Sequence, residues 1–171
     1  MGRSGLPTSP ELRFEPAAGH RAGVWPIVTA AEMQALDRRT IEARGVPGEL
    51  LMESAGRALV APALALLANA ARGVAGAGTV RAFCGAGNNG GDGFVAVRHL
   101  RAEGIPAEAV LIGDPARLPA DAAANWRRLL ALPGPQPVAR SIDPEDAAFD
   151  WSALLAETCV AIDALFGTGL R

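Results

Sequence analysis

Residues 79–93 read TVRAFCGAGNNGGDG, an apolar run that leads directly into a loop with five glycines. The apolar run, residues 79–84, predicts a β-strand, and residues 85–93 form the connecting loop. After this loop, residues 94–103 predict a helix that ends at Gly104. A strand that passes through a loop into a helix is typical of a parallel sheet whose crossover helices cover its faces.

The same alternation continues toward the end of the sequence. A strand is predicted over residues 107–112, a helix over 120–132 and another strand over 158–163. A proline-rich loop and a short helix near Trp151 connect the last two elements. Because strands and helices alternate at this spacing, we predict an α/β fold with a mainly parallel sheet and helices on its faces.

The beginning of the sequence differs in composition from the rest. Residues 1–26 mix proline, glycine, serine and charged residues without periodicity, which predicts a flexible tail before a domain over 27–171. The first helix follows Thr29, because Thr29 and Glu32 have the spacing of a capping box, and it ends at Gly45. One side of this helix carries an apolar stripe that consists of Met33, Leu36, Thr40 and Ile41.

A second, more apolar helix is predicted over residues 49–69. Its small residues at positions 54–56 (Ser-Ala-Gly) indicate that another element packs closely there, since a glycine inside a helix costs about 1 kcal/mol relative to alanine. Pro62 is expected to kink this helix or to divide it.

The overall composition is that of a globular domain. Half of the residues are hydrophobic and 20% are charged, and the formal net charge of −2 gives no basic face for nucleic acid or anionic lipid. Cys84 and Cys159 are too few for a disulfide framework or a cysteine-based metal site, so we expect two reduced thiols. No run approaches the ~20 apolar residues of a membrane span, and the N-terminus lacks the apolar core of a secretory signal. We therefore expect a cytoplasmic protein that contacts neither membrane nor nucleic acid.

The loop over residues 85–93 is the first candidate ligand site. Its glycines let the backbone approach a ligand, and the positive end of the following helix suits a phosphate. Asn88 and Asn89 add side-chain oxygens and amides for sugar hydroxyls or a hard cation. Asp92 is predicted to cap the helix that begins near Gly93. A tight turn is the alternative, but a turn needs only one glycine and one asparagine, so we favour a ligand site.

The second candidate site follows the last predicted strand. Asp163 stands where that strand ends, and a half-buried carboxylate there could serve as a general acid or base or as a cation ligand. A helix cap or a solvated loop residue is an equally good interpretation of Asp163 alone. The sequence Gly167-Thr168-Gly169 could form a second phosphate-binding turn, although this short pattern is weak evidence by itself.

Other kinds of chemistry fit the sequence poorly. His99 falls within a predicted helix and His20 within the tail, and neither has a serine or cysteine placed for a nucleophilic triad. The glycine-rich loop lacks the Lys-Ser/Thr end of a P-loop and the spacing of a dinucleotide-binding fingerprint. These absences argue against nucleotide hydrolysis and ordinary hydride transfer.

Three motifs in order give the sequence a family resemblance. They resemble the NAD(P)H-hydrate epimerase family, also called the YjeF N-terminal domain family. The resemblance covers about residue 28 to the last residue, and its middle motif is highly specific. The motifs are Pro47-Gly48-x-x-Leu51-Met52-Glu53-x-Ala55-Gly56, Gly85-x-Gly87-Asn88-Asn89-Gly90-Gly91-Asp92-Gly93 and Asp163-Ala164-Leu165-Phe166-Gly167-Thr168-Gly169-Leu170.

The resemblance implies a fold and a reaction. The family fold is a Rossmann-like three-layer α/β/α sandwich, and its members interconvert the R and S forms of hydrated NADH and NADPH. A partner dehydratase, in some proteins fused to the same chain, then restores the S form. The oligomeric state is left open, with a homodimer as one possibility.

The resemblance also implies roles for individual residues. Asn89 and Asp163 would hold a potassium ion. Asp163 is also the acidic residue that we nominate to protonate the departing hydroxyl and to deprotonate the incoming water, although its role as a cation ligand is the better supported. The expected substrate-binding residues are Asn88, Asn89, Gly90, Gly91 and Asp92 in the first loop and Gly167, Thr168, Gly169, Leu170 and Arg171 in the second.

The sequence departs from the family pattern at its end. Family members continue with further strands and a later Asp-x-Pro-Ser-Gly-type motif, whereas this sequence stops at Arg171. We therefore expect a domain that is incomplete at its C-terminal end and weak or inactive as it stands. The same domain also occurs as a non-catalytic module that binds protein or RNA. Because Asn88, Asn89 and Asp163 are all present, the enzyme is the favoured interpretation.

Overall fold

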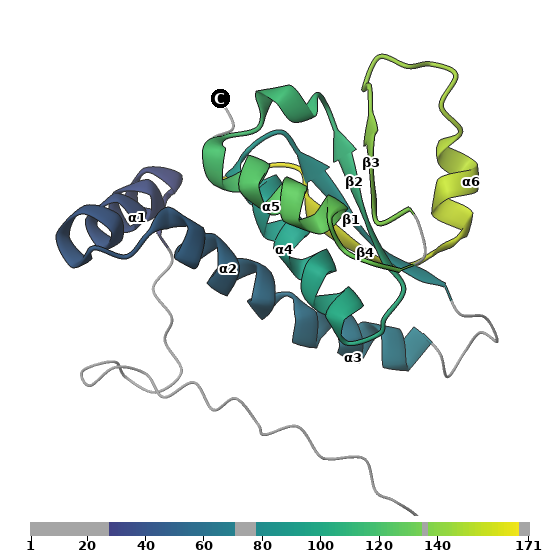
Figure 1. Ribbon diagram of the computed structural model, residues 1–171, viewed down its shortest axis with the longest axis horizontal. Coiled ribbons are helices and arrows are strands. Elements are labelled where there is room, and N and C mark those ends of the chain that lie inside the picture. The colour runs from purple at the N-terminus through teal and green to yellow at the C-terminus, as the bar shows by residue number, and fades with distance from the viewer. Residues whose placement is uncertain (1–27, 71–77, 135–136, 168–171) are drawn as a thin grey trace, which may run out of the picture.

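A computed structural model describes residues 28–70, 78–134 and 137–167 of the chain (Figure 1). The predicted tail lies outside these residues. Six α-helices and four strands are described, in the order α1 (Ala30–Arg44), α2 (Gly48–Ala58), α3 (Val60–Ala70), β1 (Thr79–Gly85), α4 (Asn88–Ala102), β2 (Ala107–Ile112), α5 (Ala120–Leu130), β3 (Ala139–Ile142), α6 (Trp151–Ala156) and β4 (Thr158–Ala164), with a short 3₁₀ helix, η1 (Pro115–Arg117), after β2.

The four strands form one parallel sheet in the order β3-β2-β1-β4. The three predicted strands are confirmed as β1, β2 and β4. Strand β3 was not predicted, because its four residues, Ala-Arg-Ser-Ile, are too few and too polar to show a strand pattern. It pairs with β2 from Ala109↔Ala139 to Ile112↔Ile142 and so extends the sheet by one strand.

The sheet is the middle of three layers. Helices α2, α3, α4 and α5 lie on one face, and α6 covers the other (Figure 1). The predicted three-layer α/β/α sandwich is therefore confirmed.

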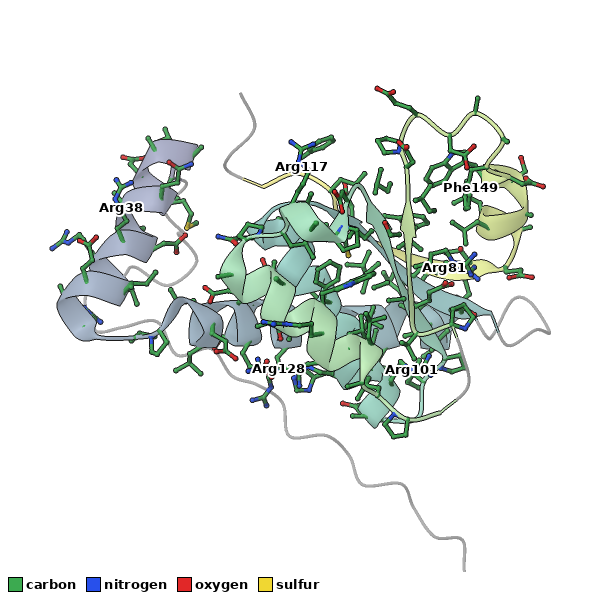
Figure 2. The ribbon with its side chains drawn as sticks, turned by 45° about the horizontal axis from the view of Figure 1, so that its top comes forward. Arg38, Arg81, Arg101, Arg117, Arg128 and Phe149 are labelled. Atoms are coloured by element: carbon green, nitrogen blue, oxygen red, sulfur yellow. The ribbon has the colours of Figure 1, made fainter. Side chains whose placement is uncertain are left out.

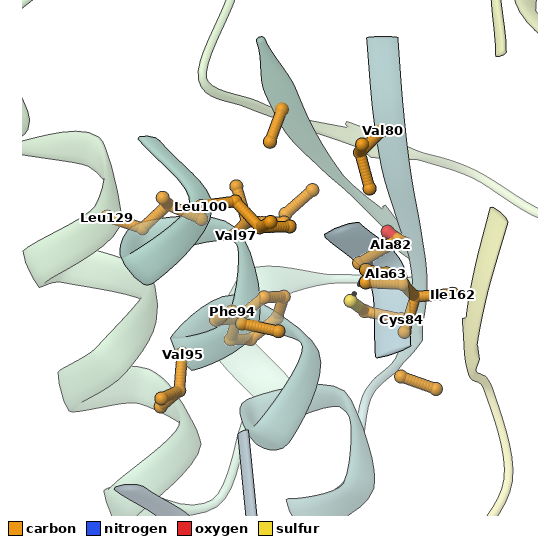
Figure 3. Close-up of a cluster of buried hydrophobic side chains, with 14 of the residues drawn as sticks. Ala63, Val80, Ala82, Cys84, Phe94, Val95, Val97, Leu100, Leu129 and Ile162 are labelled. Carbon is orange, nitrogen blue, oxygen red and sulfur yellow. Dashed lines mark hydrogen bonds between the residues drawn. The ribbon is translucent and has the colours of Figure 1, made fainter. Parts of the chain in front are cut away.

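The main core lies between the sheet and α4. Phe94, Val97 and Leu100 of α4 are fully buried against the inward side chains of β1 and β2 (Figure 3). Phe94 also packs on Trp126 of α5, with ring centroids 5.0 Å apart. A smaller apolar cluster fills the opposite face, where Val110, Ile142 and Leu154 are buried beneath α6. Both faces of the sheet are thus covered, as a parallel sheet requires.

Helix α1 begins as predicted but packs differently. The Thr29 hydroxyl accepts a hydrogen bond from the Glu32 N–H at 3.3 Å, and the Glu32 carboxylate accepts one from the Thr29 N–H at 2.7 Å, which confirms the capping box. Gly45 ends the helix in the left-handed conformation at φ 65°. No residue of α1 is buried, and the predicted stripe stays in solvent, with Leu36 49% exposed. The stripe does not pack because α1 stands apart from the sheet (Figure 1).

The second predicted helix is divided into two helices. Division was one of the two outcomes expected from Pro62, the other being a kink. Helix α2 ends at Ala58 and α3 begins at Val60, so that Pro62 falls in the first turn of α3, where a missing N–H breaks no helical bond. The close packing expected at residues 54–56 is also confirmed. A Cβ at Gly56 would lie 2.5 Å from the carbonyl oxygen of Asp92 in α4 and would overlap Val95.

Helices α2 and α3 contradict the prediction that no segment is long and apolar enough to span a membrane. Gly48–Ala68 has 21 residues and a mean hydropathy of 1.5, so by length and composition it could cross a membrane, contrary to the sequence prediction. Of the apolar window within this segment, 22% is buried in the structure. Length and composition alone do not separate a membrane span from a helix that packs on a sheet. In this fold α2 packs on α4, and α3 packs on α4 and β4.

Candidate functional site

The glycine-rich segment is mostly helix rather than loop. Helix α4 starts at Asn88 with Gly87 as its N-cap, six residues earlier than predicted. The prediction that Asp92 caps this helix is therefore wrong, because Asp92 lies within the helix. Glycine is unfavourable in an isolated helix, but here close packing of the first turns against the sheet and α2 compensates for that cost.

Three glycines of α4 serve this packing. A Cβ at Gly91 would lie 2.5 Å from Met52 Sδ, and one at Gly93 would lie 2.5 Å from Cys84 Sγ. A Cβ at Gly90 would overlap the carbonyl oxygen of Gly85. Gly87 differs, because a Cβ there would meet nothing within 4 Å. The sequence argument for a ligand site counted all five glycines, whereas at Gly90, Gly91 and Gly93 the structure explains the glycine by packing.

The N-terminus of α4 keeps free hydrogen-bond donors. Gly87 provides no side-chain cap, and the first turn contains no acidic residue. The N–H groups of Asn88, Asn89 and Gly90 have no acceptor earlier in the helix, whereas the Gly91 N–H reaches the Gly87 carbonyl at 3.3 Å. Such a helix end attracts an anion.

The two glycine-rich segments meet at one edge of the sheet. Strands β1 and β4 are neighbours, with Cys84 opposite Ala164. Beyond their ends, the Asn89 side-chain amide donates a hydrogen bond of 3.1 Å to the Phe166 carbonyl oxygen. A Cβ at Gly167 would lie 3.0 Å from the Asn89 Cβ, so a larger side chain there would crowd Asn89.

A cavity of about 670 Å³ opens at this edge. Its walls come from the first turns of α4, from the residues after β4 and from α1. The part contributed by α1 could not be predicted, because the capping box located the helix but no sequence pattern placed that helix beside the strand ends. The lining residues are Met33, Gln34, Asp37, Arg38, Gly87, Asn88, Asn89, Asp92, Leu165, Phe166 and Gly167.

The cavity brings together part of the predicted substrate-binding set. Asn88, Asn89, Asp92 and Gly167 line it. Gly90 and Gly91 are buried and do not line it. The remaining predicted residues, Thr168, Gly169, Leu170 and Arg171, lie outside the residues that the structure describes.

Asp163 lies near this edge but does not line the cavity. It is the sixth residue of β4, and its side chain is exposed rather than half-buried as expected. Its neighbours Ile162 and Ala164 are buried, so Asp163 points to the other side of the sheet. Its Oδ1 accepts a hydrogen bond from the Leu165 N–H at 3.0 Å. The predicted catalytic role of Asp163 stays a prediction.

Asp92 has the most unusual electrostatic surroundings among the cavity residues. Burial, and secondarily the negative charge of Asp37, raise the pKa of Asp92 to about 6. Burial also raises the pKa of the Cys84 thiol well above its usual range, so this cysteine stays neutral and unreactive. The reduced, buried state expected for Cys84 is confirmed, while Cys159 is a partly buried free thiol.

The predicted cation ligands have suitable chemistry. Asn89 uses its amide nitrogen to bind Phe166, which leaves its Oδ1 available, and Asp163 uses only one of its two carboxylate oxygens. No group of three or more His, Cys, Asp or Glu side chains gathers within the described ranges. An oxygen-only donor set fits a hard cation such as potassium.

These features define an α/β-sheet protein with a cavity at the carboxyl edge of its strands, beside a helix N-terminus of the kind that attracts anions. The family follows from sequence comparison. The family described as YjeF-related protein N-terminus matches residues 48–171, and the chain belongs to it.

Relatives and one solved structure agree with this assignment. The chain is 37% identical over 158 residues to the NAD(P)H-hydrate epimerase of Rhodobacter capsulatus, a match that covers 84% of this chain and 63% of that protein. It is 39% identical over 153 residues to the bifunctional NAD(P)H-hydrate repair enzyme Nnr of Salinibacter ruber, covering 85% of this chain and 27% of that protein. The crystal structure of yeast ynu0 (YNL200c) matches the fold with a TM-score of 0.66 at 23% identity, covering 86% of this chain and 59% of that one.

Proposed function

We propose that this domain interconverts the R and S forms of hydrated NADH and NADPH and so takes part in repair of the nicotinamide cofactors. The observation that carries the proposal is the cavity at the carboxyl edge of the sheet, where Asn88, Asn89 and Asp92 meet the segment that follows β4. The printed names of the relatives, NAD(P)H-hydrate epimerase and bifunctional NAD(P)H-hydrate repair enzyme, support the same reaction.

The chemistry of the cavity suits this substrate. A hydrated nicotinamide dinucleotide carries phosphates, which the free N–H groups at the start of α4 can bind. Its sugar hydroxyls can bond to the side chains of Asn88 and Asn89. The reacting carbon carries a hydroxyl beside a ring nitrogen, so loss of the hydroxyl gives a cation that the nitrogen stabilises. Water that returns to the opposite face inverts the centre.

We also propose that the site uses a potassium ion. Asn89 and Asp163 would contribute oxygen ligands, and the hydrogen bond from Asn89 to Phe166 leaves the Asn89 Oδ1 free for this purpose. When bound, the ion would supply a positive charge that offsets negative charge on the substrate.

Coupling to a dehydratase completes the proposed repair function. Several relatives are named bifunctional repair enzymes, and the chain spans about a quarter of their length. We propose that a dehydratase specific for the S form, on the same or another chain, consumes the epimerised product.

The test is direct measurement of epimerisation. Pure R-NADHX is incubated with the full-length protein, and the R and S forms are followed by chiral separation or by coupling to an S-specific dehydratase. Exchange faster than the uncatalysed rate, stimulated by potassium chloride over sodium chloride, is the expected result. Exchange at the uncatalysed rate would refute the proposed function.

A further inference from the structure

Two carboxylates from different elements line the same cavity. Asp92 lies on α4 and Asp37 lies on α1, which forms another wall. Asp37 is exposed, whereas Asp92 is partly buried. The negative charge of Asp37 acts on Asp92, so the two carboxylates are close enough to influence each other's protonation.

Asp92 differs from two other buried or partly buried carboxylates of the fold. Glu108 binds Arg81, and Glu53 binds Arg98 and His99, so each is paired with a basic side chain. No hydrogen bond or salt bridge to the Asp92 side chain is formed within the part of the chain that the structure describes. A partly buried carboxylate without a structural partner, facing a ligand cavity, is available for proton transfer.

We propose that Asp92 and Asp37 are the acid and base pair that moves protons in the epimerisation, so that the catalytic acid is Asp92 and not Asp163. This inference rests on the proposed function. An epimerase must protonate a hydroxyl that leaves one face of the ring and take a proton from water that enters the other. Two carboxylates on different walls of one cavity meet this requirement, whereas Asp163 does not line the cavity.

The proposed step balances without any further reactant. Neutral Asp92 gives its proton to the ring hydroxyl, and the carbon–oxygen bond breaks with its electron pair on the departing water. The ring nitrogen lone pair stabilises the resulting cation. A water molecule then forms a new carbon–oxygen bond on the opposite face and gives one proton to Asp37. The reverse conversion uses the same groups in exchanged roles. Between turnovers exposed Asp37 releases its proton to solvent and Asp92 takes one up from solvent, so both groups return to their starting states.

The surrounding charges agree with these roles. Burial and the charge of Asp37 favour the neutral acid form of Asp92. Arg38, beside Asp37 on α1, is the one basic side chain among the lining residues in the described ranges, and on β1 the neighbouring Cys84 is kept neutral by burial. Asp92 therefore shares the cavity with one negative and one positive side chain, and a neutral thiol lies on the neighbouring strand.

The experiment compares Asp92→Asn and Asp37→Asn with the full-length wild-type protein across a pH series. Two variants serve as matched controls, because each removes a carboxylate that lies outside the cavity. Glu103→Gln changes the residue at the C-terminal end of α4, and Glu42→Gln changes a residue of α1. Thermal melting confirms that each variant is folded. Substrate binding is measured separately from turnover, by quenching of tryptophan fluorescence with NADHX.

We expect Asp92→Asn to lower kcat by roughly 10²–10⁴-fold with NADHX binding retained, since general acid catalysis contributes about that much. Wild-type kcat/KM should fall as pH rises above about 6, where Asp92 loses its proton. Asp37→Asn should lower kcat. It should also shift the fall of kcat/KM to lower pH, because one cause of the raised pKa of Asp92 is removed.

Each outcome decides the proposal. An active wild type with a fully active, folded Asp92→Asn variant overturns the acid role and leaves the proposed function intact. A loss of NADHX binding equal to the loss of rate also overturns it, because Asp92 would then be a binding residue. An inactive wild type refutes the proposed function, and this inference with it.

Discussion

The side-chain amide of Asn89 donates a hydrogen bond of 3.1 Å to the carbonyl oxygen of Phe166, which ties the start of α4 to the segment after β4. The two residues are 77 positions apart in the sequence, and each follows a strand of the same parallel pair. The bond orients the Asn89 amide, so its oxygen faces away from Phe166. One residue of the cavity lining thus joins the two segments and keeps its side-chain oxygen free of that bond.

Replacing Asn89 with Ala should loosen the segment after β4. Loss of one hydrogen bond at a partly exposed position should cost about 1 kcal/mol of unfolding free energy. Amide hydrogen exchange at residues 165–167 should become faster than in the wild type. Asn88→Ala is the matched control, since the structure shows no side-chain bond from Asn88 to that segment. Equal exchange in the two variants would mean that this bond does not hold the segment in place.

Gly90→Ala and Gly87→Ala should have opposite effects on stability and binding. A methyl group at Gly90 would overlap the Gly85 carbonyl oxygen, so α4 would have to shift from β1 at a cost of about 3 kcal/mol. A methyl group at Gly87 meets nothing within 4 Å and faces the cavity. That variant should keep its stability within about 0.5 kcal/mol and show a raised KM for NADHX. Urea unfolding and initial rates separate the two effects, and similar stability for both variants would contradict the packing role of Gly90.

The glycines also show how far the sequence could predict this site. The alternation of strands and helices was sufficient to predict a parallel sheet with helices on its faces, because apolar periodicity is a local property. The start of α4 was misplaced because five glycines and two asparagines resemble a loop by local propensity. Only the tertiary neighbours, such as Met52 beside Gly91, show that these glycines let a helix pack closely.

The wall contributed by α1 could not be predicted for a different reason. Asp37 and Arg38 lie on α1 among other charged residues, and nothing in the local sequence distinguishes residues beside a cavity from residues in open solvent. Their position depends on how α1 sits relative to strand ends more than 40 positions later in the chain. Spatial juxtaposition at that separation leaves no pattern in a single sequence.

Replacing Asp92 with Asn should change how stability depends on pH. The folded state raises the pKa of Asp92 from 3.8 to about 6, so native Asp92 keeps a proton that the unfolded chain has released. Its contribution to stability is fully present below about pH 4 and is lost as pH rises to about 6. Because Asp92 is partly exposed, the loss should be on the order of 1 kcal/mol.

Asp92→Asn should therefore gain stability relative to the wild type between about pH 4 and about pH 6 and keep that advantage at higher pH. Urea unfolding at several pH values measures the difference. Asp37→Asn is measured alongside, because removing the charge of Asp37 should reduce the pH-dependent loss of stability without abolishing it. Parallel pH profiles for Asp92→Asn and the wild type would contradict the raised pKa.

Glu108→Gln should be among the most destabilising single changes on the α6 side of the sheet. The Glu108 carboxylate is 3% exposed and bonds both Arg81, at 2.9 Å, and Arg140. The Arg81 side chain, labelled in Figure 2, is 4% exposed and also donates to the Leu154 carbonyl at 2.8 Å. The network therefore joins β1, β2, β3 and α6. Removing one charge leaves Arg81 buried without its main partner, which should cost about 3–5 kcal/mol.

Glu157→Gln provides the control for that network. Glu157 also bonds Arg81, at 3.1 Å, but its side chain is 76% exposed, so the change should cost less than about 1 kcal/mol. Thermal unfolding at constant pH compares the two variants. If the two variants lost equal stability, burial would not make the Arg81–Glu108 ion pair stronger than the exposed Arg81–Glu157 pair.

Asp163→Asn and Asn88→Ala should affect catalysis in different ways. If Asp163 holds a potassium ion, the Asn variant keeps its size but loses the negative charge, so epimerisation should fall strongly at low potassium and recover in part at high potassium. Asn88→Ala should mainly raise KM, because amide contacts to a sugar or phosphate are made in the ground state as well as in the transition state. Initial rates over a series of potassium concentrations, with sodium chloride holding ionic strength constant, distinguish the two.

Asp163 is exposed and lies outside the cavity lining, so a direct proton-transfer role would require it to act from the edge of the site. A loss in Asp163→Asn that potassium does not relieve would return that residue to consideration as the acid, while unaltered exchange would remove it from the reaction altogether.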